Sequence, residues 1–183
     1  AGVYVDRFIL TPPAAGDAVL TDQEREMRVV VIDIGGGTTD IAIFIEGSVL
    51  HTAVMAIGGD LVTSDITYWM NVSFELAEAV KIQRGHAHMR SVDTLETFMV
   101  EPFGDGMPIE VKRYELAEVI EARVEEIFDK VLQEIKRSGY DGLLRAGAVI
   151  TGGGSMLPGV KEVAARVLGI PVRLAKPEKL TGM

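Results

Sequence analysis

Three consecutive glycines occur twice in this chain, each time directly after a run of strand-forming residues. Val29–Ile34 leads into Gly35, Gly36 and Gly37, and the run at 147–151 leads into the second set. Each glycine loses roughly 0.5–1 kcal/mol more than alanine on folding, and a two-residue turn would close a hairpin with less entropy lost. We therefore expect something to approach the backbone closely at both strand ends.

The composition of the chain limits which kinds of ligand or partner could approach these glycines. The chain has 183 residues, is 48% hydrophobic and 25% charged, and has no cysteine and a net charge of −9. These values suit one soluble domain with room for an inserted subdomain, and the acidic charge argues against nucleic acid as a partner. No apolar run reaches the ~18 residues that cross a bilayer. Neither end carries a natural initiator or terminal motif, so we expect a segment of a larger protein.

The hydrophobic pattern predicts an α/β fold. Period-two and fully apolar runs indicate strands at 29–34, 41–45, 49–57, 147–151 and 170–174. Helical spacing indicates a short helix after the prolines near residue 12, two helices within 60–85, a long amphipathic helix at 114–138 and another at 158–169. Alternating stretches within 86–113 predict a hairpin. This order predicts a mixed five-stranded sheet with helical crossovers, with Thr21 and Ser73 as helix N-caps and Gly85 as a helix stop.

The glycine turns suggest a phosphate ligand. Ligands of such sheets bind beyond the carboxyl ends of strands, where glycine lets backbone amides reach phosphate. Asp33 could then hold Mg²⁺, through water, because that ion keeps several waters. Thr38 and Thr39 could add hydroxyl donors. The alternative is two tight turns without a ligand, and neither glycine set matches a Walker loop or a dinucleotide fingerprint.

The longer motifs resemble a known superfamily. DIGGGTTDIAIF resembles the second phosphate motif of the actin, sugar-kinase and heat-shock chaperone ATPases, and ITGGGSMLPGV resembles their adenosine motif. The flanks AIGGDLVTSDI, AEAVKIQRGHA and GIPVRLAKPEKLTGM are similar to the bacterial cell-division FtsA family. The resemblance covers essentially the whole chain, whereas the MreB and PilM families share the glycine motifs but fit the flanks less well.

The resemblance implies an actin-like (ribonuclease H-like) fold with an ATP site. It places Asp33 and residues 35–38 at the phosphates and Mg²⁺, and it assigns nucleoside contacts to Gly58, Gly59, Glu78, Lys81, Gly152, Gly153, Gly154 and Ser155. Judged from spacing alone, Glu78 and Lys81 share a helix face and would be a surface ion pair.

The resemblance also implies a function and a division of the chain. Residues 1–58 and 114–183 would form the nucleotide-binding subdomain, and 59–113 an inserted partner-binding subdomain. FtsA proteins bind ATP, polymerise, contact other divisome proteins and link the FtsZ ring to the cytoplasmic face of the inner membrane through a C-terminal amphipathic helix. No first phosphate motif and no such helix occur here, so we expect the second lobe alone, with no ATPase activity by itself and weak activity at most in the full-length protein. The alternative is another superfamily lobe: MreB-like, PilM-like, or from a sugar or acetate kinase.

A basic cluster in the inserted segment suggests the partner site. The chain is acidic overall, yet this segment collects Lys81, Arg84, Arg90, Lys112 and Arg113. The resemblance implies that the segment holds the C-terminal tail of FtsZ, which combines apolar and acidic residues. The alternative is a set of solvated surface charges.

Overall fold

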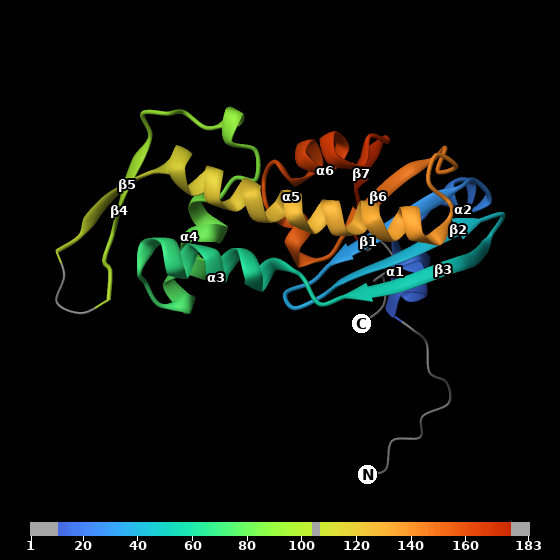
Figure 1. The fold of residues 1–183 in the computed structure, drawn as a ribbon, viewed down its shortest axis with the longest axis horizontal. Coiled ribbons are helices and arrows are strands. Elements are labelled where there is room, and N and C mark those ends of the chain that lie inside the picture. Colours follow the sequence, from blue (N-terminus) through green and yellow to red (C-terminus); the bar gives the residue numbers. More distant parts are fainter. Residues whose placement is uncertain (1–10, 104–106, 177–183) are drawn as a thin grey trace, which may run out of the picture.

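A mixed five-stranded sheet forms the centre of the molecule (Figure 1). The structure, a computed structural model, describes residues 11–103 and 107–176. The strand order is β3-β2-β1-β6-β7, with bounds Ser48–Met55, Thr39–Ile45, Val29–Ile34, Gly147–Thr151 and Val172–Leu174. The β1–β2 and β2–β3 pairs are antiparallel, and the β1–β6 and β6–β7 pairs are parallel. The predicted mixed sheet is confirmed.

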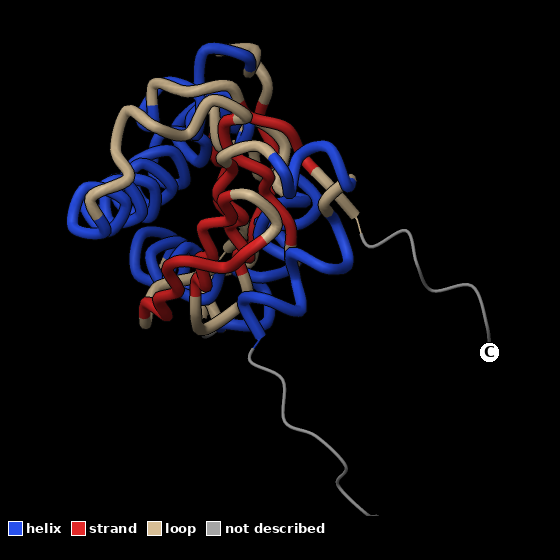
Figure 2. The backbone as a smooth tube through the Cα atoms, turned by 90° about the vertical axis from the view of Figure 1, so that its right-hand side faces the viewer, coloured by secondary structure: helices blue, strands red, loops and turns tan. Residues whose placement is uncertain are grey.

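Helices cover both faces of this sheet (Figure 2). The long helix α5 (Arg113–Ser138) and α6 (Val160–Leu168) cover one face, where Ile32 and Phe128 belong to the main apolar core. Helix α1 (Thr11–Val19) packs on the other face, against a smaller apolar cluster that includes Phe44. A Cβ on Gly16 would lie 2.2 Å from the Phe44 ring, so α1 lies directly on β2. Alternate residues of each strand therefore enter separate cores.

The segment between β3 and α5 extends the molecule beyond one end of the sheet. It contains α3 (Gly59–Met70), α4 (Phe74–Arg84), the short helix η1 (Met89–Ser91) and the predicted hairpin, β4 (Thr97–Val100) with β5 (Ile109–Lys112). Figure 1 shows these elements along the N-terminal part of α5. One apolar cluster runs through both parts, so the subdomain boundary at 59–113 remains a prediction. Among the described helices, none has the length and hydropathy needed to cross a bilayer.

Local signals set most helix ends. Thr21 forms a capping box with Glu24 at the start of α2 (Asp22–Glu26), and Ser73 accepts a hydrogen bond from Leu76 N at 3.1 Å. Gly85 ends α4, as predicted. The prolines were expected before the first helix, but α1 begins at Thr11 and includes both. Proline fits the first helical turn because the amide that it lacks has no partner there.

The pairing of Glu24 with Arg173 joins α2 to β7 and predicts an acid-sensitive contribution to stability. Arg173 Nε lies 2.5 Å from Glu24 Oε1, and this hydrogen bond is the main reason that the pKa of Glu24 falls from 4.5 to about 2. A lowered carboxyl pKa stabilises the fold above pH 4.5, and this gain is lost as pH falls towards 2.

Glu24→Gln should therefore lower the free energy of unfolding by about 1 kcal/mol at pH 7, the upper end for exposed pairs. Glutamine retains the capping box, so the change isolates the charge. Urea unfolding at pH 7 and near pH 2 would check this. An equal difference between the two proteins at both pH values would contradict it.

Candidate functional site

A cavity of about 450 Å³ opens where the end of β1 meets α3, α4, α5 and the loop after β6. It is lined on one side by apolar residues such as Val124 and Phe128 of α5. Many of the predicted nucleotide-contacting residues line it: Gly35, Gly36, Gly59, Glu78, Lys81, Gly153 and Gly154. The structure thus brings together residues from four separate segments of the sequence.

A polar network forms one wall of this cavity. Lys81 Nζ lies 2.6 Å from Glu78 Oε2, donates to Thr63 Oγ1 at 2.7 Å and donates to the Gly59 carbonyl at 3.1 Å. The Lys81 side chain is only 12% exposed, so this is not the surface ion pair that spacing suggests. Burial alone would raise the pKa of Glu78, but hydrogen bonds from Lys81 and Thr63 hold it below its usual value. These contacts fix both side chains in position at the cavity wall.

The first glycine loop is attached to α3 through its backbone. Gly59 N donates to the Gly35 carbonyl at 2.9 Å, and Asp60 N donates to the Gly36 carbonyl at 2.9 Å. A Cβ on Gly58 would lie 2.4 Å from the Gly36 carbonyl oxygen. Glycine at 58 is therefore explained by close approach of two backbone segments within the chain. Part of the close approach expected at the glycine turns is contact with the protein itself.

At two other positions, Gly37 and Gly153, no close approach within the chain requires glycine. A Cβ on Gly37 or on Gly153 would meet nothing within 4 Å among the described residues, and neither φ lies in the left-handed region. Both residues are exposed. Gly152 and Gly154 differ, since a Cβ on either would come within 2.5 Å of Asp33 or Ile34. The open positions indicate room for a ligand outside the chain.

The three hydroxyl side chains of the site differ in their exposure and in whether they already donate a hydrogen bond within the chain. Thr38 is exposed at the glycine loop, whereas Thr39 is fully buried and donates to the Ile57 carbonyl at 2.7 Å. Ser155 is also buried and donates to the Gly152 carbonyl at 2.7 Å. The hydrogens of Thr39 and Ser155 are thus already used within the chain, which leaves Thr38 as the free donor among the three.

Asp33 faces a different hollow. It lines a space of about 450 Å³ on the α1 face of the sheet, together with Ala18, Gly152, Gly153 and Ser155 among others. Burial, and then the charge of Asp40, raise the pKa of Asp33. Carboxylate oxygens are ligands that Mg²⁺ prefers, and one oxygen of the neighbouring buried Asp40 has no hydrogen-bond partner. Asp33 is therefore the carboxylate in this hollow that could contact a divalent cation, and the described residues contain no cluster of three or more metal-ligating side chains. Only Gly153 lines both spaces among the predicted residues.

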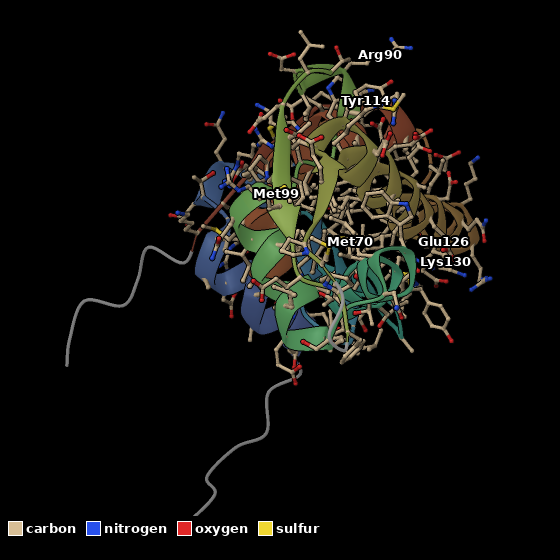
Figure 3. All side chains as sticks on the ribbon, turned by 90° about the vertical axis from the view of Figure 1, so that its left-hand side faces the viewer. Met70, Arg90, Met99, Tyr114, Glu126 and Lys130 are labelled. Carbon is tan, nitrogen blue, oxygen red and sulfur yellow. The ribbon has the colours of Figure 1, made fainter. Side chains whose placement is uncertain are left out.

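The predicted basic cluster does not form one continuous patch. Lys81 belongs to the cavity, and Arg113 donates to the Arg84 carbonyl at 2.8 Å and to Glu96 at 2.7 Å. Lys112 lies 3.5 Å from Glu115. Arg84 and Arg90 are exposed, and neither side chain pairs with any described residue. Figure 3 shows Arg90 at the edge of the molecule.

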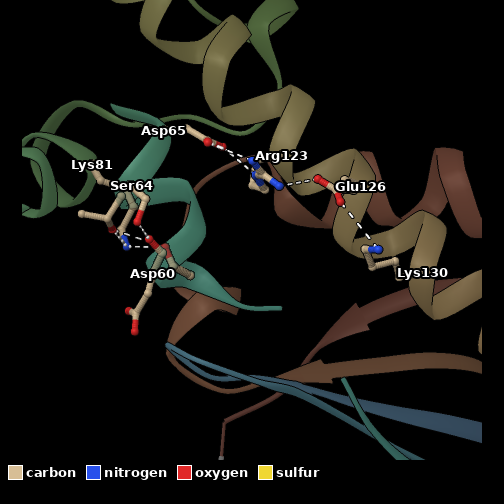
Figure 4. Close-up of polar contacts among 9 residues, drawn as sticks. Asp60, Ser64, Asp65, Lys81, Arg123, Glu126 and Lys130 are labelled. Atoms are coloured by element: carbon tan, nitrogen blue, oxygen red, sulfur yellow. Dashed lines mark hydrogen bonds and ion pairs between the residues drawn. The ribbon is translucent and has the colours of Figure 1, made fainter. Parts of the chain in front are cut away.

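An ion-pair group links α3 to α5 beside the cavity (Figure 4). Arg123 donates to both oxygens of Asp65, at 2.6 and 2.8 Å, and also binds Glu126. Lys130 lies 3.7 Å from Glu126. Sequence patterns did not reveal the Arg123–Asp65 pair or the role of Thr63, because both depend on how separate helices pack against each other.

Comparison with known structures confirms the actin-like fold. MreB5 of Spiroplasma citri bound to ADP aligns with a TM-score of 0.66 at 22% identity, over 86% of this chain and 51% of that one. The MamK double helical filament aligns with a TM-score of 0.60 at 21% identity, over 83% of this chain and 50% of that one.

Sequence comparison identifies the family. The family model described as "Cell division protein FtsA" matches residues 30–183. The FtsA proteins of Pseudomonas aeruginosa and Neisseria meningitidis are 44% and 40% identical, each over 100% of this chain and 44% of the relative. The chain thus spans less than half the length of these relatives. With its actin-like sheet and both glycine motifs in place, it belongs to the FtsA family of cell-division proteins.

Proposed function

We propose that this chain is the second actin-like lobe of an ATP-binding protein that links the FtsZ ring to the membrane and forms filaments. The observation that carries the proposal is the cavity beside the glycine loop, which the Lys81–Glu78 pair lines together with Gly35 and Gly36. The MreB5 neighbour was solved with ADP and also with AMPPNP, which supports a nucleotide as the occupant.

Each part of the site has a role in this proposal. The exposed amides around Gly37 and the Thr38 hydroxyl would bind phosphate oxygens, since glycine allows close approach. Glu78 and Lys81 would hold the nucleoside at the cavity wall, and Gly153 and Gly154 would form its floor. Asp33 would hold Mg²⁺, which balances the phosphate charge. Phosphoryl transfer needs groups around the γ-phosphate from several sides, so we expect no ATPase activity from this lobe alone.

The inserted segment is the proposed partner surface. Exposed apolar side chains lie on it together with Arg84 and Arg90: Ile82, Leu95, Met99, Phe103 and Met107. Figure 3 shows Met99 on the outer side of β4. An apolar surface with nearby positive charge suits the FtsZ tail. The proposal also includes contacts with other divisome proteins, filament formation and attachment to the cytoplasmic face of the inner membrane. A kinase lobe is not favoured, because the family match covers most of the chain.

Nucleotide binding tests the proposal directly. This chain alone should bind ATP weakly, because half of the cleft is missing, whereas a protein with both lobes should bind at least a hundredfold more tightly, about 2.7 kcal/mol. Isothermal titration calorimetry of both proteins with Mg²⁺-ATP would measure this. Submicromolar binding by the single lobe would contradict the half-cleft interpretation, and no binding by the two-lobe protein would contradict the proposed function.

A further inference from the structure

The central sheet ends in two edge strands that differ in length and in composition. The strand order places β3 at one edge and β7 at the other. β7 has three residues, contains Arg173 and follows Pro171. β3 has eight residues, SVLHTAVM, without proline, lysine, arginine or a carboxylate. Proteins usually protect exposed edges with short strands, proline, charge or bulges, and of these devices β3 has only a bulge beside Leu50.

Two apolar side chains of β3 are exposed to solvent. Leu50 is 49% exposed and Val54 is 63% exposed. The residues that alternate with them face the main core, since Ala53 packs against it and His51 lies 3.1 Å from Glu134 of α5. Successive side chains of a strand point to opposite faces. Leu50 and Val54 therefore lie on the α1 face of the sheet, and their exposure shows that α1 leaves them uncovered.

Backbone hydrogen-bonding groups of β3 also point away from the sheet. Gly35 N donates to the Thr38 carbonyl at 2.8 Å, which makes these two residues a hydrogen-bonded pair at the end of the β1–β2 ladder. Hydrogen-bonded and non-hydrogen-bonded pairs alternate along an antiparallel ladder. Followed through the β1–β2 and β2–β3 registers, this alternation turns the N–H and C=O groups of Thr52 and Val54 away from β2. No described strand pairs with them.

These features make β3 complementary to a second copy of itself. Leu50 and Val54 are each two residues from Thr52 along the strand. Antiparallel pairing centred on Thr52 would place Leu50 of each copy opposite Val54 of the other, and it would join the outward-facing backbone groups of the two Thr52 residues. Because β3 contains no lysine, arginine or carboxylate, this pairing opposes no like charges.

We propose that β3 pairs with β3 of a second copy of this chain, in an antiparallel register centred on Thr52. The pairing joins two five-stranded sheets into one and covers Leu50 and Val54. A two-fold pair closes on itself, so it differs from an open filament and does not depend on nucleotide. A strand pair about 17 Å long over residues 50–54 buries less than the roughly 1,200 Å² typical of stable interfaces. The dimer therefore forms weakly and reversibly, and cross-linking detects it better than chromatography.

Cysteine cross-linking provides the test, because the chain has no cysteine of its own. Thr52→Cys would be treated with a short bifunctional methanethiosulfonate reagent and analysed on non-reducing gels. It should form cross-linked dimers at least tenfold faster than Ser48→Cys, an exposed control position on the same strand. In the proposed register the two Ser48 residues would lie roughly 26 Å apart. Equal rates for the two cysteine variants would overturn the proposal.

Charge substitutions in the Thr52→Cys protein test the register. Leu50→Lys with Val54→Lys would oppose lysines across the pair and should slow cross-linking at least tenfold. Leu50→Lys with Val54→Glu would oppose lysine and glutamate and should restore most of the rate. Both positions are exposed, so the fold should tolerate these changes, and circular dichroism would verify this. If the lysine–glutamate protein cross-links no faster than the lysine–lysine protein, the proposed register is wrong.

The same cysteine in a two-lobe protein, with any other cysteines replaced, tests whether the edge is open in a longer chain. Cross-linking without nucleotide should proceed there at a similar rate. Dimers of the single lobe alone would mean that the other lobe covers β3, and they would overturn the pairing.

Discussion

Gly58→Ala is expected to lower the free energy of unfolding by about 1–3 kcal/mol, the usual range for overpacking. The added Cβ would lie 2.4 and 2.7 Å from the carbonyl oxygens of Gly36 and Gly35. The backbone at 58 is extended, so alanine is not strained by its own φ and the obstacle is the neighbouring chain. Relief requires α3 to move away from the glycine loop, which would break the bonds from Gly59 N and Asp60 N.

Gly37→Ala is the matched control, and we expect it to leave stability unchanged but to weaken ATP binding. Its Cβ would meet nothing within 4 Å in the described structure, so stability should stay within about 0.5 kcal/mol of wild type. In the two-lobe protein, however, its affinity for ATP should fall at least tenfold, about 1.4 kcal/mol, since the methyl group would stand where phosphate approaches the backbone.

Urea unfolding and ATP titration of both variants would check these expectations. A stable Gly58→Ala protein would show that the loop can shift at little cost. Unchanged ATP affinity in Gly37→Ala would show that the open glycine turn is not a phosphate site.

The sheet and its glycine turns could be predicted from sequence because their signals are local. Val29–Ile34 is buried along nearly its whole length, and Gly147–Thr151 repeats that pattern, so apolar runs followed by glycine identified both strands. Helix ends at Ser73 and Gly85 also follow from single residues. Strand limits were less accurate, since β3 ends at Met55 and not at 57. The last residues of an apolar run can leave the sheet without any change in sequence pattern.

The arrangement of the site was harder to predict. The resemblance supplied Glu78 and Lys81, but the partner Thr63 lies on another helix and has no motif of its own. Alternation along β1 could have shown that Asp33 and Ile34 face opposite sides of the sheet. This alternation would have indicated that the hollow lined by Asp33 and the cavity lined by Ile34 lie on opposite sides of the sheet. The basic cluster remains a prediction, but sequence alone could not show which of its charges have partners: Arg113 donates to the Arg84 carbonyl and to Glu96.

Arg84 and Arg90 therefore carry the remaining prediction about the partner. Both are exposed, and neither side chain pairs with any described residue, so they are available to an acidic peptide. Reversing both to glutamate should weaken binding of the FtsZ tail peptide about tenfold at low salt, and it should flatten the fall of affinity with salt. Charges at the rim of a binding site act mainly through such salt-sensitive attraction, while the apolar side chains near Met99 would supply most of the binding energy.

A matched double reversal controls for net charge. Arg145 and Lys161 are exposed, lie outside the inserted segment and form no ion pair with a described residue, so their change to glutamate alters total charge equally. Arg84 lies in the last turn of α4, where a negative charge costs about 0.3–1 kcal/mol, too little to unfold the domain.

Fluorescence anisotropy with a labelled tail peptide would measure binding by both double variants, and circular dichroism would verify that they fold. Equal loss in the two would mean that only total charge matters, and no loss in either would mean that the arginines are solvated surface charges. Selective loss in the Arg84 and Arg90 double would place the tail beside these two arginines, at the end of α4 and in η1, within the inserted segment that also carries exposed apolar side chains.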